Sequence, residues 1–388
     1  MLVVEKYLDR SGGHETTQVS AMQNLVENRS LIFVTGSQCD FAFDDLSTVL
    51  TVLSTRKDVN ATPAQAVDHD FHSMRNILSA EKRHHEPILY VTAQTHDLRV
   101  ALRLVSRVPL SQKVYMRVLL DREIAQLTDD ERVALKFAVE AGRIVLLTET
   151  DSLAKFFLAR YGLTFHETAL CLPCSVFPGQ TVNFPYVPRP MKRRFRVGCL
   201  GGWRAEKGVE TLPQFIRDLR DALDAEHDAP KVELIIQKRP TRKSFKGIKK
   251  SIKRDYQFWR SVGFPLPGKR LSLSFRTTNL SKDEFLATLM SVDLLVVPYR
   301  LEEYRHRGSG IVLDGVAARK PIVYTRGMGM SEFLTHGNAE AASEDPKDYA
   351  GKVVKILSNI EIYRTGADQA AVELETRIER AAIFLRSI

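Results

Sequence analysis

The chain has 388 residues, of which 44% are hydrophobic and 27% charged, values typical of folded globular proteins. This composition excludes a disordered or fibrous chain, and the length predicts two domains of ordinary size. Four cysteines do not suggest a disulfide framework, and Cys171 and Cys174 lack the second pair or histidine cluster of a zinc site.

The formal charge of +9 is unevenly distributed. Residues 1–185 hold 19 of the 56 basic side chains and 22 of the 47 acidic ones. The remainder of the chain therefore holds 37 basic and 25 acidic side chains. A positive surplus in the second half favours a polyanionic ligand or an anionic surface as its partner.

The start of the chain and its apolar runs predict a cytoplasmic protein. Glu5 and Asp9 fall where a signal peptide needs a continuous apolar core. The most apolar stretches, such as 292–297, are far shorter than the roughly 20 residues that cross a bilayer.

In the first half, short apolar runs rich in β-branched residues alternate with amphipathic segments, the pattern of an α/β fold with a parallel sheet. The predicted strands are 2–7, 31–35, 88–92, 114–119 and 144–148, each followed by a helix. We therefore predict a Rossmann-like first domain over residues 1–185.

Residues 178–196 contain four prolines and then three consecutive basic residues, so this stretch is predicted to be an interdomain linker. After it the βα alternation restarts, and we predict a second Rossmann-like domain over 186–370 and a C-terminal helix over 371–388 that packs back toward the first domain. The predicted elements are strands 195–200, 231–237, 271–275, 293–298 and 321–325 and helices 209–225, 282–290 and 310–318, with a helical tail from 346.

The first predicted strand of the second domain leads directly into Gly201, Gly202, Arg204, Lys207 and then a helix. Backbone N–H groups at such a turn, together with the positive end of the helix, form a site where a phosphate can approach closely. The alternative is a tight turn with two solvated cations.

A second glycine loop precedes another predicted helix in the same domain. Ser309, Gly310 and Ile311 follow the strand 293–298, and Asp314 lies about one turn into the helix, where it could accept hydrogen bonds from a ribose. The alternative is a carboxylate that stabilises the helix dipole. Both loops would lie at the carboxyl ends of the strands, where open sheets bind ligands.

From 195 to 329 these motifs occur in an order that resembles the C-terminal domain of family 4 retaining glycosyltransferases, which have the GT-B fold of two Rossmann-like domains facing a cleft. The resemblance implies that Arg204 and Lys207 bind the diphosphate of a nucleoside diphosphate sugar. It also implies that Ser309 and Gly310 hold the distal phosphate and Asp314 the ribose. Where the family has two glutamates eight positions apart, the first near the transferred sugar and the second on the ribose, this chain has His306 and Asp314, so the resemblance places His306 in the donor site.

The first half resembles the acceptor domain of these enzymes through two segments. Gly12, Gly13 and His14 follow the first predicted strand, and His96 follows the third. In GT-B enzymes loops at such positions face the cleft, so His96 is a candidate catalytic group on the acceptor side. A lone histidine is more often structural or merely exposed.

Nine lysines and arginines and no acidic residue lie between Lys238 and Arg254. With the apolar Ile248 and Ile252, this run could bind an anionic membrane surface that carries a lipid-linked acceptor; a solvated basic face is the alternative. Phe245 is the only aromatic residue inside the run, which disfavours nucleic acid as the partner.

Together these features predict a metal-independent hexosyltransferase that has no cofactor and uses a nucleoside diphosphate sugar as donor. The acceptor would be a saccharide or lipid-linked, in polysaccharide or glycolipid synthesis, with retention of configuration implied by the resemblance. The expected location is the cytoplasm, with peripheral membrane association through the basic run. The alternatives are a nucleotide-sugar epimerase of the same architecture and a GT-B-like scaffold that has lost catalysis.

Overall fold

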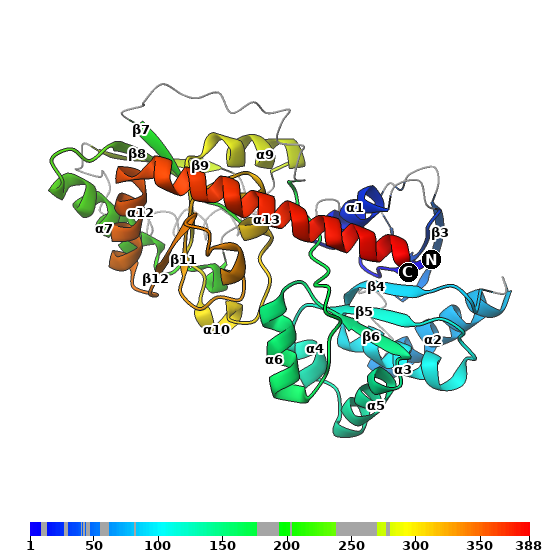
Figure 1. The fold of residues 1–388 in the computed structure, drawn as a ribbon. Helices are drawn as coiled ribbons and strands as arrows, with labels where there is room; N and C mark the ends of the chain where they lie inside the picture. Colours follow the sequence, from blue (N-terminus) through cyan, green and yellow to red (C-terminus); the bar gives the residue numbers. More distant parts are fainter. Residues whose placement is uncertain are drawn as a thin grey trace, which may run out of the picture. The chain divides into compact units, whose positions relative to one another are not determined.

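The computed structural model describes residues 1–8, 14–26, 30–39, 41, 43, 47–54, 62–80, 83–176, 194–201, 204–237, 270–276 and 280–388. The chain divides into two compact units (Figure 1). The first contains residues 1–174, 306–308 and 376–388, and the second contains 175–305 and 309–375.

The first unit is built on a six-stranded parallel sheet whose order is β3-β2-β1-β4-β5-β6. Five of these strands were predicted; the edge strand β3 was not, because only one of its six residues is buried and it lacks the buried apolar run of a central strand. The strands are β1 (Leu2–Val4), β2 (Ile32–Gly36), β3 (Thr48–Leu53), β4 (Ile88–Ala93), β5 (Val114–Val118) and β6 (Ile144–Leu147).

Helices connect these strands, and local capping explains where several begin. Thr128 accepts a hydrogen bond from the Glu131 N–H at the start of α5, and Thr150 does the same for Leu153 at the start of α6. The helices are α1 (His14–Leu25), α2 (Pro63–Ala80), α3 (Thr95–Arg107), α4 (Asp121–Ala125), α5 (Asp129–Glu140) and α6 (Asp151–Tyr161).

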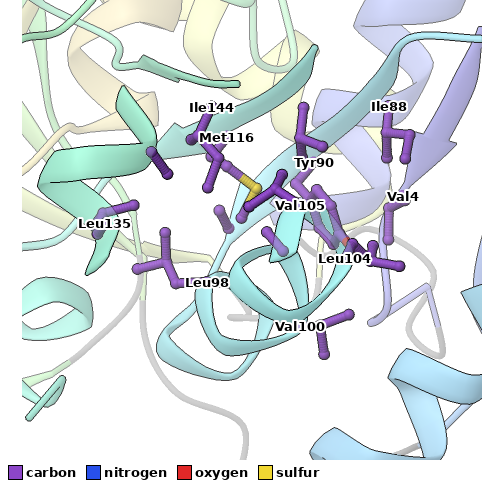
Figure 2. Close-up of a cluster of buried hydrophobic side chains, with 14 of the residues drawn as sticks. Val4, Ile88, Tyr90, Leu98, Val100, Leu104, Val105, Met116, Leu135 and Ile144 are labelled. Atoms are coloured by element: carbon purple, nitrogen blue, oxygen red, sulfur yellow. The ribbon is translucent and has the colours of Figure 1, made fainter. Parts of the chain in front are cut away.

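One hydrophobic core of the first unit is formed by side chains of the sheet and of helices that include α2, α3 and α5. Figure 2 shows Leu104 and Val105 of α3 beside side chains of the central strands, among them Tyr90 and Met116. Each of these side chains is almost completely buried. Burial of a large aliphatic or aromatic side chain contributes about 1.5–3 kcal/mol, so this cluster fixes α3, and with it the residues at its N-terminus, against the sheet.

The second unit repeats the same topology. Its sheet is parallel throughout, and its order, β9-β8-β7-β10-β11-β12, has the connectivity of the first sheet. The edge strand β12 was not predicted, because Ala-Glu-Ala-Ala carries no strand signal. The strands are β7 (Arg194–Cys199), β8 (Lys231–Gln237), β9 (Leu271–Arg276), β10 (Leu294–Val297), β11 (Ile322–Thr325) and β12 (Ala339–Ala342).

The described helical segments of the second unit include short 3-10 turns beside the longer helices. Ser281 caps α9 in a capping box with Glu284, and Asp345 caps α12, which has Pro346 at its first turn. The segments are η2 (Ala205–Lys207), α7 (Leu212–Ala225), α9 (Lys282–Ser291), α10 (Leu301–Tyr304), α11 (Gly310–Ala317), η3 (Ser331–Phe333), α12 (Pro346–Ser358) and the start of α13 (Ile360–Ser387).

The last turns of α13 belong to the first unit. There Phe384 contacts Tyr115 and His166, with ring centroids 5.8 Å and 4.7 Å away. No helix among the described residues is long and apolar enough to span a bilayer.

The expected α/β class with two Rossmann-like sheets is confirmed. In each sheet the strand order reverses between two central strands, β1 and β4 in the first unit and β7 and β10 in the second. Open α/β sheets bind ligands at the carboxyl ends of such a pair, so polar groups at these two positions are candidate site residues.

Candidate functional site

In the second unit, the loop after β7 is held by contacts that include its own lysine. Gly201 has a φ of 102°, in the region that favours glycine, and its N–H donates to Gln237 Oε1 at 2.8 Å. Lys207 Nζ donates to the Gly201 carbonyl oxygen. The ammonium group of Lys207, a predicted phosphate ligand, therefore lies over the carboxyl end of β7.

The same loop lies directly on the end of β10. Gly208 has a φ of 74°, and a Cβ at this position would lie 2.0 Å from the Pro298 carbonyl oxygen, so only glycine fits. The Arg300 N–H donates to the Glu206 carbonyl oxygen at 3.0 Å. These contacts bring the segment that follows β7 against the segment that follows β10.

The second predicted glycine loop meets the first at this point. A Cβ placed on Gly201 would lie 3.1 Å from Lys207 Nζ, 3.0 Å from the Tyr299 hydroxyl and 3.8 Å from Ile311 Cβ. Lys207 Nζ is also 5.3 Å from the centre of the Tyr299 ring, a cation–π distance. The two loops therefore converge on one edge of the second sheet.

The helix that follows the second loop is fixed by close packing. Residues 311–317 of α11 are buried, and a Cβ on Gly315 would lie 2.6 Å from Leu295 Cδ1 of β10. Ser309 is the N-cap, and its carbonyl oxygen accepts the Val312 N–H at 3.0 Å. The N–H groups of Gly310 and Ile311 lie before this first hydrogen bond of the helix, in the turn whose N–H groups have no acceptor within a helix. The positive end of this helix lies where Ile311 approaches Gly201.

A small cavity of about 30 Å³ lies beside Lys207, Gly208, Gln237 and Tyr299. This is room for about one water molecule. A diphosphate would therefore have to lie over the two loops and not within this cavity. Arg204, the other predicted phosphate ligand, is 53% exposed and its Nε contacts Glu206 Oε1 at 3.1 Å.

Asp314, predicted to bind a ribose, is bound to backbone instead of exposed. Its side chain is 3% exposed, and Oδ1 accepts hydrogen bonds from the N–H groups of Ser175 at 2.7 Å and Val176 at 2.9 Å. Burial raises the pKa of Asp314 to about 7, although these two hydrogen bonds oppose the rise. The ribose role stays a prediction and would involve a carboxylate that already anchors residues 175 and 176.

His306, which occupies the position of the first family glutamate, belongs to the first unit together with residues 307 and 308. Its ring stacks on Phe156, with centroids 3.7 Å apart and planes inclined by 13°. A Cβ on Gly308 would lie 1.8 Å from Glu149 Oε2, so this backbone lies directly against a buried carboxylate. Glu149 in turn pairs with the fully buried Arg117 at 3.5 Å.

In the first unit, the predicted His96 belongs to a polar cluster at the carboxyl ends of β1 and β4. His96 Nε2 is 2.6 Å from Asp70 Oδ2 and 3.1 Å from Lys6 Nζ, and Lys6 donates to Asp70 at 2.9 Å and to Ser54 Oγ at 2.6 Å. Lys6, Ser54 and Asp70 were not predicted from the sequence. Lys6 and Ser54 are 48 residues apart along the chain, and Ser54 and Asp70 are 16 residues apart, so no short motif contains all three.

Two further buried carboxylates adjoin this cluster in the sequence, Glu5 beside Lys6 and Asp97 beside His96. Burial, and then the neighbouring Asp97 carboxylate, raise the pKa of Glu5 to about 8. Burial likewise raises the pKa of Asp97, whose Oδ2 accepts the Gln94 N–H at 2.9 Å. At neutral pH Glu5 is therefore largely protonated.

Several predicted residues cannot be compared with the structure. Gly12, Gly13, Gly202 and the basic run 238–254 lie outside the described residues. His14 begins α1, but its side chain is also outside them. Among the residues that are described, no three His, Cys, Asp or Glu side chains are grouped as metal ligands would be.

No protein-family model and no curated protein sequence matches the chain. Solved structures do match over its whole length. A sucrose-phosphate synthase (tll1590) from Thermosynechococcus elongatus has a TM-score of 0.63 at 12% identity, covering 100% of this chain and 97% of its own. An α,α-trehalose-phosphate synthase (UDP-forming) from Burkholderia xenovorans, in complex with glucose-6-phosphate, has a TM-score of 0.63 at 14% identity, covering 100% and 99%.

A third similar structure is Anabaena Alr3699/HepE in complex with UDP, with a TM-score of 0.58 at 12% identity and coverage of 100% and 97%. At such low identity the similarity establishes the fold. The chain therefore has the α/β fold of GT-B glycosyltransferases, with two Rossmann-like units.

Proposed function

We propose that the chain is a glycosyltransferase that moves a hexosyl group from a nucleoside diphosphate sugar to a hydroxyl of a saccharide or lipid-linked acceptor. The observation that carries this proposal is the convergence of Gly201, Lys207 and the N-terminus of α11 at the edge of the second sheet. A lysine, a glycine turn and a helix N-terminus are the groups that bind a diphosphate.

The same groups account for the chemistry. As the bond from the sugar to the diphosphate breaks, negative charge grows on the leaving oxygen, and the Lys207 ammonium and the N–H groups near Gly310 would stabilise it. Arg204 is exposed enough to swing onto the distal phosphate. This arrangement supplies positive charge from side chains and dipoles, so the proposed reaction does not require a bound metal ion.

The similar structures support the choice of substrates. The HepE structure is a complex with UDP, a similar trehalose-6-phosphate structure from E. coli is bound with UDP-2-fluoro glucose, and the Burkholderia xenovorans structure is a complex with glucose-6-phosphate. We therefore propose a UDP-sugar as the first donor to test and a saccharide hydroxyl as the acceptor. Membership of family 4, retention of configuration, a role in polysaccharide or glycolipid synthesis and membrane contact through 238–254 stay parts of the proposal.

The proposal is tested by Lys207→Ala, with UDP binding and sugar transfer as readouts. Loss of one such electrostatic group typically lowers turnover by about 10²–10³. UDP should raise the unfolding temperature of the wild type, because it binds only the folded chain, and should raise that of the variant much less. Lys231→Ala, an exposed lysine at the start of β8, is the matched control and should behave as the wild type.

Wild-type turnover by Lys207→Ala would refute the assignment of the site. Product analysis separates the alternatives: an epimerase would convert the UDP-sugar without extending an acceptor, and a catalytically inactive scaffold would bind UDP but release none from UDP-sugars.

A further inference from the structure

A groove of about 850 Å³ lies in the first unit, where α3 contacts both α2 and α5. Its apolar lining comes from all three helices and includes Val67, Leu102 and Phe137. Cavities of about 300–1,000 Å³ with an apolar lining and a few charged groups are typical of small-molecule sites. The size and the lining of this groove therefore suit a small ligand.

One large apolar side chain of the groove is exposed to solvent. Phe137 of α5 is 72% exposed, and Ala134, about one turn before it, also lines the groove and is exposed. On α3, Leu102 is partly buried and Val105 is buried. An exposed phenylalanine beside a partly buried leucine is an apolar surface that a hydrocarbon chain would cover from water.

Two of the arginines that line the groove are paired with carboxylates of the neighbouring helices. Arg99 donates from Nε to Glu131 Oε1 at 2.8 Å and from Nη2 to Glu131 Oε2 at 3.1 Å. Arg103 pairs with Asp68. These two arginines join α3 to α5 and to α2, and their positive charge is offset within the fold.

Arg107 and Arg143 also line the groove, and both are exposed. Among the residues that the structure describes, neither forms an ion pair with a carboxylate. The Arg107 guanidinium lies 5.8 Å from the centre of the Phe71 ring, and the guanidinium of Arg75 lies 5.9 Å from the same ring. Two cations therefore share one aromatic ring near the end of α3, and this end of the groove would attract an anion.

Both of these arginines lie at the same end of the groove. Arg107 is the last residue of α3, which leads into β5, and the Arg143 carbonyl oxygen accepts the N–H of Val114, the first residue of β5, at 3.0 Å. They therefore lie at the amino ends of the strands, whereas the polar cluster of Lys6 and His96 lies at the carboxyl ends. The groove is thus separate from that cluster.

The groove is too short for a docked peptide helix. The part of α3 that lines it runs from Arg99 to Arg107, a rise of about 12 Å at about 1.5 Å per residue. An isolated helix needs about 12 residues or more to be stable, a length of about 18 Å, so it would extend beyond the groove. An aliphatic chain needs no secondary structure of its own and can be shorter.

We propose that this groove binds a single-chain amphiphile with an anionic head, such as a fatty acid. Its aliphatic chain lies along Leu102, Val105 and Phe137, and its head lies on Arg107 and Arg143. Removal of the chain from water favours binding, and a guanidinium forms strong hydrogen bonds with a carboxylate. The inference does not depend on the proposed function, since none of these residues belongs to the proposed donor site.

The site of the head is tested by titration calorimetry of the full chain with dodecanoate, below the concentration at which it forms micelles. One dodecanoate should bind per chain, and the double variant Arg107→Gln/Arg143→Gln should bind it at least about tenfold more weakly. The control Lys136→Gln/Lys155→Gln removes the same charge at exposed lysines outside the groove and should bind as the wild type. Dodecyltrimethylammonium, which has the opposite charge, should bind the wild type at least about tenfold more weakly than dodecanoate.

The site of the aliphatic chain is tested by a substitution and by a shorter ligand. Phe137→Ser should weaken dodecanoate binding at least about fivefold, because it removes apolar surface that the chain covers. Leu158→Ser on α6, which is 51% exposed and outside the groove, is the control and should bind as the wild type. Decanoate, which is two methylenes shorter, should bind the wild type about tenfold more weakly than dodecanoate. Both substituted side chains are exposed, so both variants should fold, which circular dichroism checks.

Several results would overturn the proposal. The first is no binding of dodecanoate, or binding at many weak sites that the Arg107→Gln/Arg143→Gln variant retains. The second is binding to phosphatidylglycerol vesicles, through these arginines, by a chain that does not bind dodecanoate; the groove would then be a membrane surface. The third is a dimer in sedimentation that Phe137→Ser dissociates, because a second copy of the chain would then cover the groove. None of these results affects the transferase assignment, which Lys207→Ala tests separately.

Discussion

The buried carboxylate of Asp314 should make the stability of the chain depend on pH, and Asp314→Asn should remove that dependence. Its pKa is about 7 in the folded chain and 3.8 for an unperturbed aspartate. The difference is about 3 units, and each unit corresponds to about 1.4 kcal/mol of free energy of unfolding. The largest effect of this one group is therefore about 4 kcal/mol.

The sign follows from which state holds the proton. Between pH 3.8 and pH 7 the folded chain retains a proton that the unfolded chain has lost. The contribution of Asp314 is therefore fully present below pH 3.8 and is lost as pH rises through 7. Of the total, about 3 kcal/mol should be lost between pH 5 and pH 8.

The assay is urea unfolding of the wild type and of Asp314→Asn at pH 5 and pH 8. Asparagine keeps an oxygen that can accept the Ser175 and Val176 N–H groups, but it does not titrate. Any constant cost of burying the new amide is the same at both pH values, so only the change with pH is compared. Relative to the wild type, the variant should gain about 3 kcal/mol from pH 5 to pH 8.

The control is Asp283→Asn, an exposed aspartate in the first turn of α9, which should change with pH as the wild type does. If Asp314→Asn and the wild type change in parallel between the two pH values, the reasoning from burial is refuted. The same variant tests the ribose role, because loss of that carboxylate should also reduce the stabilisation by UDP.

Three further variants test the packing around the sites by thermal or urea unfolding. Gly208→Ala should lower the free energy of unfolding by more than about 2 kcal/mol, because its Cβ would lie 2.0 Å from a carbonyl oxygen. Gly351→Ala, which has open space around it in a helix, should raise that free energy by about 0.5–1 kcal/mol. Equal effects of the two substitutions would contradict the packing. The free energy of unfolding should fall less in Glu5→Gln than in the wild type as pH rises from 4.5 to about 8. An equal fall in both would contradict the raised pKa of Glu5. Arg117→Met should lower the free energy of unfolding by about 3–5 kcal/mol, because it leaves Glu149 buried and unpaired. A double variant that removes both charges should lower it by less. Equal losses would show that the two charges are not coupled.

The convergence of the loop after β7 on the end of its sheet could be predicted from sequence because its signals are local. Gly201, Lys207 and Gly208 lie within eight consecutive residues, and each performs its role through backbone shape or a short reach. The buried apolar runs of the central strands predicted both sheets. The edge strands β3 and β12 were missed because an edge strand needs no such run.

Burial and long-range partners could not be predicted in the same way. The partners of Asp314 were not predicted, because Ser175 and Val176, whose N–H groups donate to its carboxylate, lie almost 140 residues earlier. The stacking of His306 on Phe156, 150 residues earlier in the sequence, was not predicted either. Contacts between such distant segments depend on the complete fold and leave no spacing in the sequence.

The two sheets share one strand order but place different chemistry at the point where that order reverses. In the second unit the contacts are made mainly by backbone and one lysine, and glycines allow the close approach that the proposed diphosphate site requires. In the first unit the contacts are made by side chains from four segments, which surround the buried carboxylate of Asp70. The same βα topology therefore supports two different kinds of polar site.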